Sequence, residues 1–212
     1  MGATKRLSEI IVQAFAYDAQ INSLKKQNQK TCFSMVRFGN VLSSSGSAVP
    51  IFIKQIRSGG PVTLTHPKIT RFFMTIKEAS QLVIQSSAMA QGGEVFLLDM
   101  GKPICIKDLV IKLIKLSGLQ LKDDLNPNGD IEIKITGLRP GEKLYEELLI
   151  DAETENTDHP LIFRAKENFI IMDEIIPKLK DLKKNIDERN KDQTLKILNE
   201  LVKEWENQNK IN

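Results

Sequence analysis

Two arginines in this chain are placed so that they could bind a diphosphate. Arg71 lies in the run ITRFFMT, and Arg139 opens RPGE, a tight turn in which proline fixes φ and glycine lets the backbone approach a partner. Each guanidinium has forked donors that can meet phosphate oxygens in pairs, so two of them could clamp one diphosphate from two sides. Taken singly, each arginine also fits a surface position or an ion pair.

Two further polar residues lie close to the arginines or at a strand end. Asn40 follows a β-rich run in RFGN, at the strand edge where α/β folds collect ligands, and its amide both donates and accepts hydrogen bonds. An asparagine flanked by glycine also suits the turn itself. Glu142, three residues after Arg139, could accept hydrogen bonds from a ribose diol, although a carboxylate after glycine is also common at a helix start.

The other residues that could carry chemistry form no recognisable site by spacing alone. Met1 and Lys5 are four residues apart at the start of a predicted helix and so share a face, a spacing that also fits a solvated lysine. His66 and His159 both precede a proline, and no cysteine or carboxylate spacing joins them. We therefore expect no metal site.

The composition excludes several classes of protein. The chain has 212 residues, 41% hydrophobic and 27% charged, which excludes a mainly disordered chain. Its net charge of +3 is too small to predict nucleic-acid binding. The sequence holds no apolar stretch long enough to span a membrane, and only two cysteines, Cys32 and Cys105. We expect no membrane segment in this chain and a reducing, cytoplasmic location.

Helical and strand patterns alternate along the chain. Apolar spacing predicts a long helix over 4–27, and the Gly/Ser-rich stretch 39–47 predicts a loop where the backbone passes close to a partner. Ser47 is the predicted N-cap of the next helix. The remaining expected elements are helices at 48–59, 76–90, 105–118 and two within 172–206, strands at 31–38, 61–65, 69–75, 94–99, 131–137 and 163–170, and a polar connector at 150–160.

This alternation predicts an α/β fold in which helices cover a sheet. A chain that binds a dinucleotide in the usual way opens with a strand, a glycine-rich turn and a helix. The glycines here never form G-x-G-x-x-G or a Walker A sequence. The sequence therefore lacks the usual dinucleotide fingerprint.

Five segments together resemble the C-terminal half of the sugar-nucleotide 4,6-dehydratases of capsule and glycan biosynthesis, in the extended short-chain dehydrogenase/reductase family. The resemblance runs from residue 1 to about residue 165. In order, the segments are MGATKR (1–6), VRFGNVLSSSGSAVPIF (36–52), GGPVTLTHPKITRFFMT (59–75), GGEVFLLDMGKPICIKDL (92–109) and TGLRPGEKLYEELL (136–149).

The resemblance implies a reaction and a cofactor. In this family a Rossmann half binds NAD and the C-terminal half closes over a UDP-sugar. Hydride removal from C4 of the sugar acidifies the C5 hydrogen, the C6 hydroxyl is eliminated, and the hydride returns to C6, so the cofactor is regenerated in each turnover. The expected substrate is a UDP-N-acetylhexosamine, and the product is a 4-keto-6-deoxy sugar.

Residue roles follow from matching this sequence to the family motifs. Most relatives carry Y-x-x-x-K, and this chain reads Met1-x-x-x-Lys5, as in the long, membrane-anchored branch whose acid/base groups lie further upstream. Lys5 is then the one catalytic and NAD-binding residue of the set. Asn40, Arg71 and Arg139 match positions that hold the nucleotide diphosphate, and Glu142 matches one that meets the uridine ribose. Ser43 replaces the glycine usual in GSSGS, and a side chain there could narrow the pocket.

The same resemblance implies a domain division. Residues 1–45 match the end of the Rossmann-like domain, 46–168 the smaller α/β substrate-binding region with segments that return to the Rossmann-like domain, and 169–212 a C-terminal helical extension. We expect the N-terminal dinucleotide-binding half to be missing and the chain to be inactive alone. The alternatives are a nucleotide-sugar epimerase of the same family and a truncated module that binds a UDP-sugar without turning it over. Relatives often form dimers or hexamers, so a homo-oligomer is compatible with the resemblance.

Overall fold

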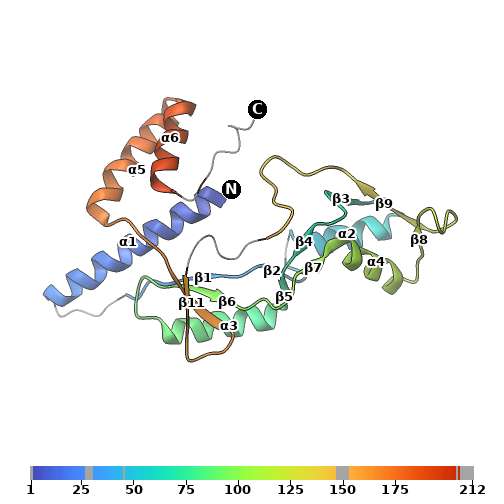
Figure 1. Ribbon diagram of the computed structural model, residues 1–212, viewed down its shortest axis with the longest axis horizontal. Helices are drawn as coiled ribbons and strands as arrows, with labels where there is room; N and C mark the ends of the chain where they lie inside the picture. The colour runs from blue at the N-terminus through green and yellow to red at the C-terminus, as the bar shows by residue number, and fades with distance from the viewer. Residues whose placement is uncertain (1, 27–30, 45, 147–152, 204, 206–212) are drawn as a thin grey trace. The chain divides into compact units, whose positions relative to one another are not determined.

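The computed structural model describes residues 2–26, 31–44, 46–146, 153–203 and 205. The chain folds into two compact units, each assembled from several stretches of sequence (Figure 1). Unit 1 comprises Met1–Arg37, Val83–Leu98 and Leu149–Asn212, and unit 2 comprises Phe38–Leu82 and Asp99–Leu148. The predicted α/β class is confirmed, whereas the predicted functional division at residues 45 and 168 stays a prediction.

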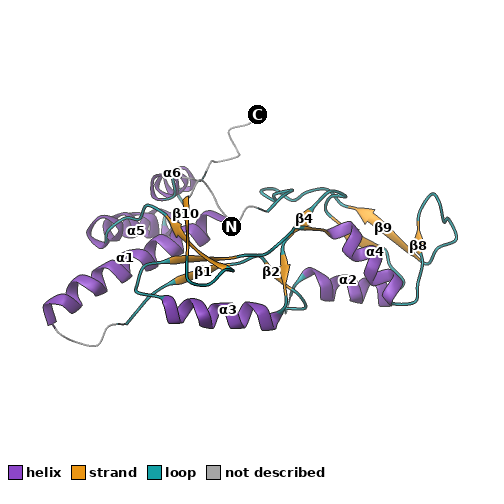
Figure 2. Cartoon of the chain, turned by 60° about the horizontal axis from the view of Figure 1, so that its bottom comes forward, coloured by secondary structure: helices purple, strands orange, loops and turns teal. Residues whose placement is uncertain are grey.

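Unit 1 is built on a four-stranded mixed sheet. The strand order is β1-β6-β11-β10, with β1 parallel to β6 and the other neighbours antiparallel. Helix α1 lies on one side of this sheet and helix α3, which runs on from unit 2, on the other (Figure 2). The elements are α1 (Gly2–Lys26), β1 (Met35–Arg37), α3 (Ile76–Met89), β6 (Val95–Leu98), β10 (Glu153–Asn156), β11 (Ile162–Lys166), α5 (Met172–Asp187) and α6 (Lys191–Leu201).

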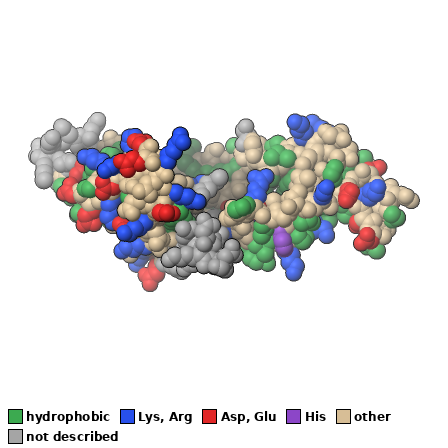
Figure 3. All heavy atoms as spheres, turned by 90° about the horizontal axis from the view of Figure 1, so that it is seen from above, with side chains coloured by type: hydrophobic (Ala, Val, Ile, Leu, Met, Phe, Trp, Pro, Cys, Tyr) green, Lys and Arg blue, Asp and Glu red, His purple; other side chains and the backbone are tan. Residues whose placement is uncertain are grey.

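The two C-terminal helices cover α1. Their apolar sides and one side of α1 form a single buried cluster of Leu7, Ile10, Ala14, Ile175, Leu182, Ile197, Leu201 and Val202. Their outer face is polar, with acidic and basic side chains intermixed (Figure 3), as expected for amphipathic helices that bury one stripe. No helix among the described residues is long and apolar enough to cross a membrane.

A largely buried network of ion pairs joins α1 to the sheet of unit 1. Arg37 on β1 donates to Glu9 on α1 at 2.7 Å and to Glu167, just after β11, at 2.6 Å. Arg6 on α1 lies 2.7 Å from the other oxygen of Glu167, whose side chain is only 7% exposed. Burial opposes the charge on Arg37, but the hydrogen bonds and charges of the two glutamates raise its pKa above the ordinary value.

Removing one carboxylate from this network should cost stability. Glu167→Gln leaves two largely buried guanidinium groups to share one carboxylate, so we expect the free energy of unfolding to fall by about 2–4 kcal/mol. Urea unfolding followed by circular dichroism measures the change. The matched control, Glu132→Gln on an exposed position of unit 2, should change it by less than about 0.5 kcal/mol. Equal effects of the two substitutions would contradict a structural role for the network.

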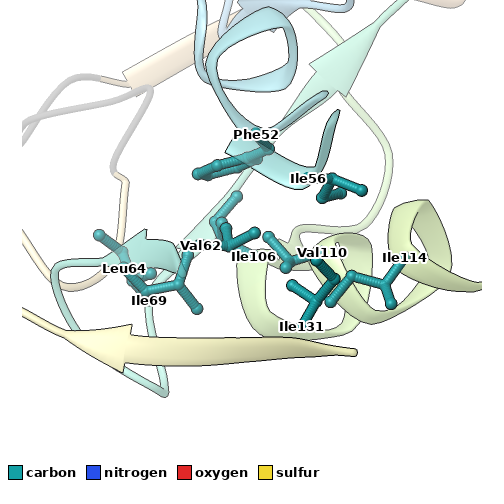
Figure 4. Packing of buried hydrophobic residues seen from close by; sticks show 9 residues of the cluster. All are labelled: Phe52, Ile56, Val62, Leu64, Ile69, Ile106, Val110, Ile114 and Ile131. Carbon is teal, nitrogen blue, oxygen red and sulfur yellow. The ribbon is translucent and has the colours of Figure 1, made fainter. Parts of the chain in front are cut away.

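Unit 2 packs two helices onto a small parallel sheet. Strand β9 lies between β3 and β8 and is parallel to both. Side chains of α2 and α4 meet those of β3 and β9 in a closed apolar core (Figure 4), whose members are Phe52, Ile56, Val62, Leu64, Ile69, Ile106, Val110, Ile114 and Ile131. The elements are β2 (Asn40–Val41), α2 (Ala48–Arg57), β3 (Val62–Leu64), β4 (Thr70–Arg71), β5 (Phe73–Met74), β7 (Ile104–Cys105), α4 (Ile106–Leu116), β8 (Leu121–Lys122) and β9 (Ile131–Ile135).

Several local predictions differ from the structure, each for a physical reason. The strand expected over 69–75 is two strands, because the chain changes partner at Phe72 from β7 to β2. The polar connector expected at 150–160 contains β10, an edge strand whose four side chains are all exposed and so show no apolar alternation. The strand expected at 163–170 is β11, which ends at Lys166. The expected ends at Gln27 and Glu206 lie outside the described residues.

Candidate functional site

Asn40 is held by a short parallel pairing inside unit 2. Strand β2 pairs with β5 so that Asn40 lies opposite Phe73, and the Asn40 N–H donates to the Phe72 carbonyl at 2.9 Å. The two chains are close at this point. A Cβ atom on Gly39 would lie 3.0 Å from the Phe72 Cβ, so a side chain there would force the strands apart.

Arg71 ties β4 to the turn that follows β9. Its guanidinium donates to the carbonyl of Thr70 at 2.7 Å, of Lys143 at 3.0 Å and of Leu144 at 3.3 Å. The Thr70 N–H also donates to the Leu144 carbonyl at 3.3 Å. Several of the five donors of Arg71 are therefore directed at backbone of this chain.

Glu142 contacts both predicted arginines, Arg71 through its guanidinium and Arg139 through its backbone. Its carboxylate accepts from the Thr65 hydroxyl at 2.9 Å and from the backbone N–H of Arg139 at 3.0 Å. The Arg71 guanidinium lies 3.8 Å from the same carboxylate. Burial works against the charge, but these two hydrogen bonds and the positive charges of both arginines together hold the pKa of Glu142 below its ordinary value.

Thr65 is a member of this cluster that sequence reasoning missed. It follows β3, and the Thr136 N–H donates to the Leu64 carbonyl at 2.8 Å, which brings the turn at 139–142 beside the end of β3. A single threonine after a strand gives no pattern that distinguishes it from any other strand residue. Only the parallel register of β3 and β9 could have identified it.

The loop before α2 contains backbone that favours glycine. Ser43 has φ of 60°, in the left-handed region, where glycine is the residue with the least steric cost. Ser47 takes the predicted N-cap position but makes no side-chain cap hydrogen bond, and its hydroxyl oxygen has no partner among the described residues. The predicted cap is thus right in position and wrong in bonding.

The structure places four of the predicted site residues in one unit and Lys5 in the other. Asn40, Arg71, Arg139 and Glu142 all belong to unit 2, where main-chain bonds and the Glu142 carboxylate link them. Arg139 is exposed, as is Lys5 in the first turns of α1 in unit 1. Met1 lies outside the described residues.

Both histidines make local turn contacts. The His66 Nδ1 accepts from the Lys68 N–H at 3.1 Å, and the His159 Nδ1 accepts from the Leu161 N–H at 3.2 Å. In each case a proline follows the histidine, and the imidazole accepts from the backbone N–H of the residue after that proline. Each ring is therefore used in its own turn.

Comparisons with known proteins place these features in a family. A family model described as polysaccharide biosynthesis protein matches residues 1–167. The capsular polysaccharide biosynthesis protein CapD of Staphylococcus aureus is 50% identical over 204 residues, which cover 94% of this chain and 30% of CapD. A UDP-glucose 4-epimerase of Rickettsia rickettsii is 30% identical over 158 residues, which cover 74% of this chain and 41% of the epimerase.

A solved structure supports the same relation at the level of the fold. Pen from Bacillus thuringiensis is 34% identical and matches with a TM-score of 0.61 over 81% of this chain and 48% of that chain. The chain therefore spans less than half the length of each of these three proteins.

The lowered pKa of Glu142 predicts a pH-dependent contribution to stability. Because the carboxyl titrates lower in the folded state, its contribution is present above the ordinary pKa of 4.5 and is lost as the pH falls through the folded value. The loss in unfolding free energy between pH 4.5 and about 3 should be smaller in Glu142→Gln than in the wild type. Urea unfolding at a series of pH values measures both. Parallel pH curves for the two proteins would show that these contacts do not stabilise the charge.

The backbone at position 43 predicts a stabilising substitution. Ser43→Gly removes the steric cost of a left-handed residue and should raise the free energy of unfolding by about 0.5–1 kcal/mol. Ser44→Gly is the matched control, because φ of Ser44 is not positive and glycine there only adds freedom to the unfolded chain. It should lower the free energy by a similar amount. Thermal or urea unfolding measures both changes, and two changes of the same sign would refute the interpretation.

Proposed function

The chain belongs to the polysaccharide biosynthesis protein family, and from that premise we propose that it supplies the substrate-binding part of a sugar-nucleotide 4,6-dehydratase. The proposed substrate is a UDP-N-acetylhexosamine, and the proposed product is a 4-keto-6-deoxy sugar for surface polysaccharide. The observation that carries the proposal is that one carboxylate of unit 2, Glu142, accepts from the backbone N–H of Arg139 and lies 3.8 Å from the Arg71 guanidinium.

In this proposal the two arginines have different tasks. Arg139 is exposed and its guanidinium is available to bind phosphate oxygens in a bidentate manner. Arg71 donates to the carbonyls of residues 143 and 144 and so fixes the turn that carries Arg139, while its positive charge remains close by for the diphosphate. Fixing the turn in advance lowers the entropy lost when the ligand binds.

Glu142 and Asn40 would complete the nucleotide contacts. The hydrogen bonds that Glu142 accepts favour its charged form, and a charged carboxylate is a strong acceptor for the two hydroxyl groups of a ribose. Asn40 is fixed next to Phe72 by its backbone, which leaves its side-chain amide as both donor and acceptor.

The chain offers one residue for a nicotinamide cofactor. The glycine pattern that binds a dinucleotide pyrophosphate is not in this sequence, whereas exposed Lys5 suits a contact to the nicotinamide ribose. The chemistry that NAD supplies when bound is removal of a hydride at C4 of the sugar and its return at C6. The role proposed for Lys5 is to hold that ribose, and acid/base groups would come from sequence upstream of residue 1.

An epimerase is the second candidate. The 30% identity to a protein named UDP-glucose 4-epimerase favours it. Both reactions would use the same nucleotide-binding residues, so these residues do not separate the two candidates. The two differ in the fate of the oxidised sugar. Product analysis on a longer protein that includes the upstream residues separates them, since only dehydration yields a 4-keto-6-deoxy sugar.

Calorimetric titration with UDP-N-acetylglucosamine tests the proposed site. We expect binding in the micromolar to millimolar range and no measurable binding of NAD to this chain. Arg139→Ala should weaken UDP-sugar binding by about 1.5–3 kcal/mol, the usual worth of a hydrogen bond to a charged group. Arg189→Ala, which removes an exposed arginine of unit 1, is the charge-matched control and should leave the affinity unchanged. Equal losses in both variants, or NAD binding without a UDP-sugar response, would reject the site.

A further inference from the structure

Unit 1 contains a cavity that is separate from the residues assigned to the nucleotide sugar. It has a volume of about 470 Å³ and lies where the second half of α1, the start of β6 and the end of β11 meet. Cavities of about 300–1,000 Å³ are typical of small-molecule sites. None of the four nucleotide-site residues of unit 2 lines it, so the inference drawn from it does not rest on the proposed function.

One residue of the cavity wall carries a buried acceptor that has no partner in the described part of the chain. Gln13 is only 6% exposed, and its amide nitrogen donates to the Gly93 carbonyl at 3.4 Å. Its Oε1 is buried and has no hydrogen-bond partner among the described residues. Buried side-chain oxygens are nearly always hydrogen-bonded, so an unused one in a cavity wall points to a ligand that donates to it.

A buried donor and two aromatic rings belong to the same wall. Arg164 lines the cavity, and its Nε is buried without a partner in the described part of the chain. Tyr17 and Phe169 also line it, with ring centroids 5.4 Å apart and planes tilted by 55°. Both rings are about two-fifths exposed, which leaves apolar surface open to a ligand.

The charges around the cavity balance and do not favour an anion. Lys166 lies 2.9 Å from Glu155, and the Arg164 guanidinium lies 4.0 Å from the same carboxylate. Glu94 and Glu167 also line the wall, and the Glu167 carboxylate is already paired with Arg6 and Arg37. A phosphate or carboxylate ligand would meet these negative charges, whereas a neutral ligand would not.

We propose that this cavity binds a neutral saccharide unit. A hydroxyl group both donates and accepts, so the hydroxyls of one sugar ring can serve the unused acceptor of Gln13 and the unused donor of Arg164. The apolar C–H face of the ring would pack on the exposed surface of Tyr17 and Phe169.

The probe is free N-acetylglucosamine, tested on the full chain by saturation-transfer NMR and calorimetric titration. Gln13→Leu removes the unused acceptor at similar volume and should weaken binding at least tenfold. The same substitution also removes the 3.4 Å bond to the Gly93 carbonyl, so Tm is measured beside binding to show that the variant is folded. Tyr17→Ala, at a half-exposed position, should also weaken binding, and Gln81→Leu, at an exposed position of α3, should not.

Several results would overturn the proposal. These are no saturation transfer to N-acetylglucosamine in the wild type, unchanged binding in Gln13→Leu, or displacement of the sugar by inorganic phosphate, which would indicate an anion site. Arg139→Ala separates this cavity from the nucleotide-sugar site. Binding retained in Arg139→Ala supports a second site, and binding lost there would mean that the sugar occupies the site in unit 2.

Discussion

The candidate site in unit 2 depends on where the Glu142 carboxylate is held. One of its oxygens accepts from Thr65 after β3, the other accepts from the backbone of Arg139, and the Arg71 guanidinium lies beside them. Two segments distant in the sequence, 65–71 and 139–142, are thereby brought together. Without this carboxylate, the positive charges of Arg71 and Arg139 would lose a counter-charge that both of them now stabilise, which is unfavourable until an anion binds.

Unit 1 also holds two arginines beside carboxylates. It differs from the candidate site in unit 2 because two carboxylates are present and because the side chains are more deeply buried. There, Arg6 and Arg37 share Glu9 and Glu167 in a network that is largely removed from water. Such a network fixes the orientation of α1 on the sheet because each guanidinium has a defined donor geometry. Lys5 and the proposed saccharide cavity both depend on α1, so the same ion pairs position residues at both ends of that helix.

Much of the fold could be predicted from local pattern. The helices at 48–57, 76–89 and 106–116 follow from apolar spacing and from terminating residues, and the glycines at 59 and 92 do adopt positive φ after helices. The long first helix was predicted, but Phe15 on its expected apolar stripe is 48% exposed. The helix is buried along more than one face, against α5 and α6 and against the sheet, so a single stripe does not describe it.

The site residues could be selected from sequence, but their contacts could not. The types and order of Asn40, Arg71, Arg139 and Glu142 pointed to a diphosphate, and their shared location in unit 2 is consistent with that interpretation. The backbone contacts of Arg71 and the hydroxyl of Thr65 depend on strand register between distant segments, which no local spacing encodes. β10 and the split at Phe72 were missed for the same reason.

The hydrogen bond from the Asn40 N–H to the Phe72 carbonyl has an evolutionary consequence. It sets the separation of Asn40 and Arg71 through main-chain atoms alone. The lengths of the intervening loop, helix and strand therefore do not determine that separation. Homologues can therefore lengthen or shorten the surface loops in this interval without moving the two side chains apart, provided that position 39 remains small enough for the strands to touch. In this architecture, the length of those loops and the separation of Asn40 from Arg71 are therefore independent.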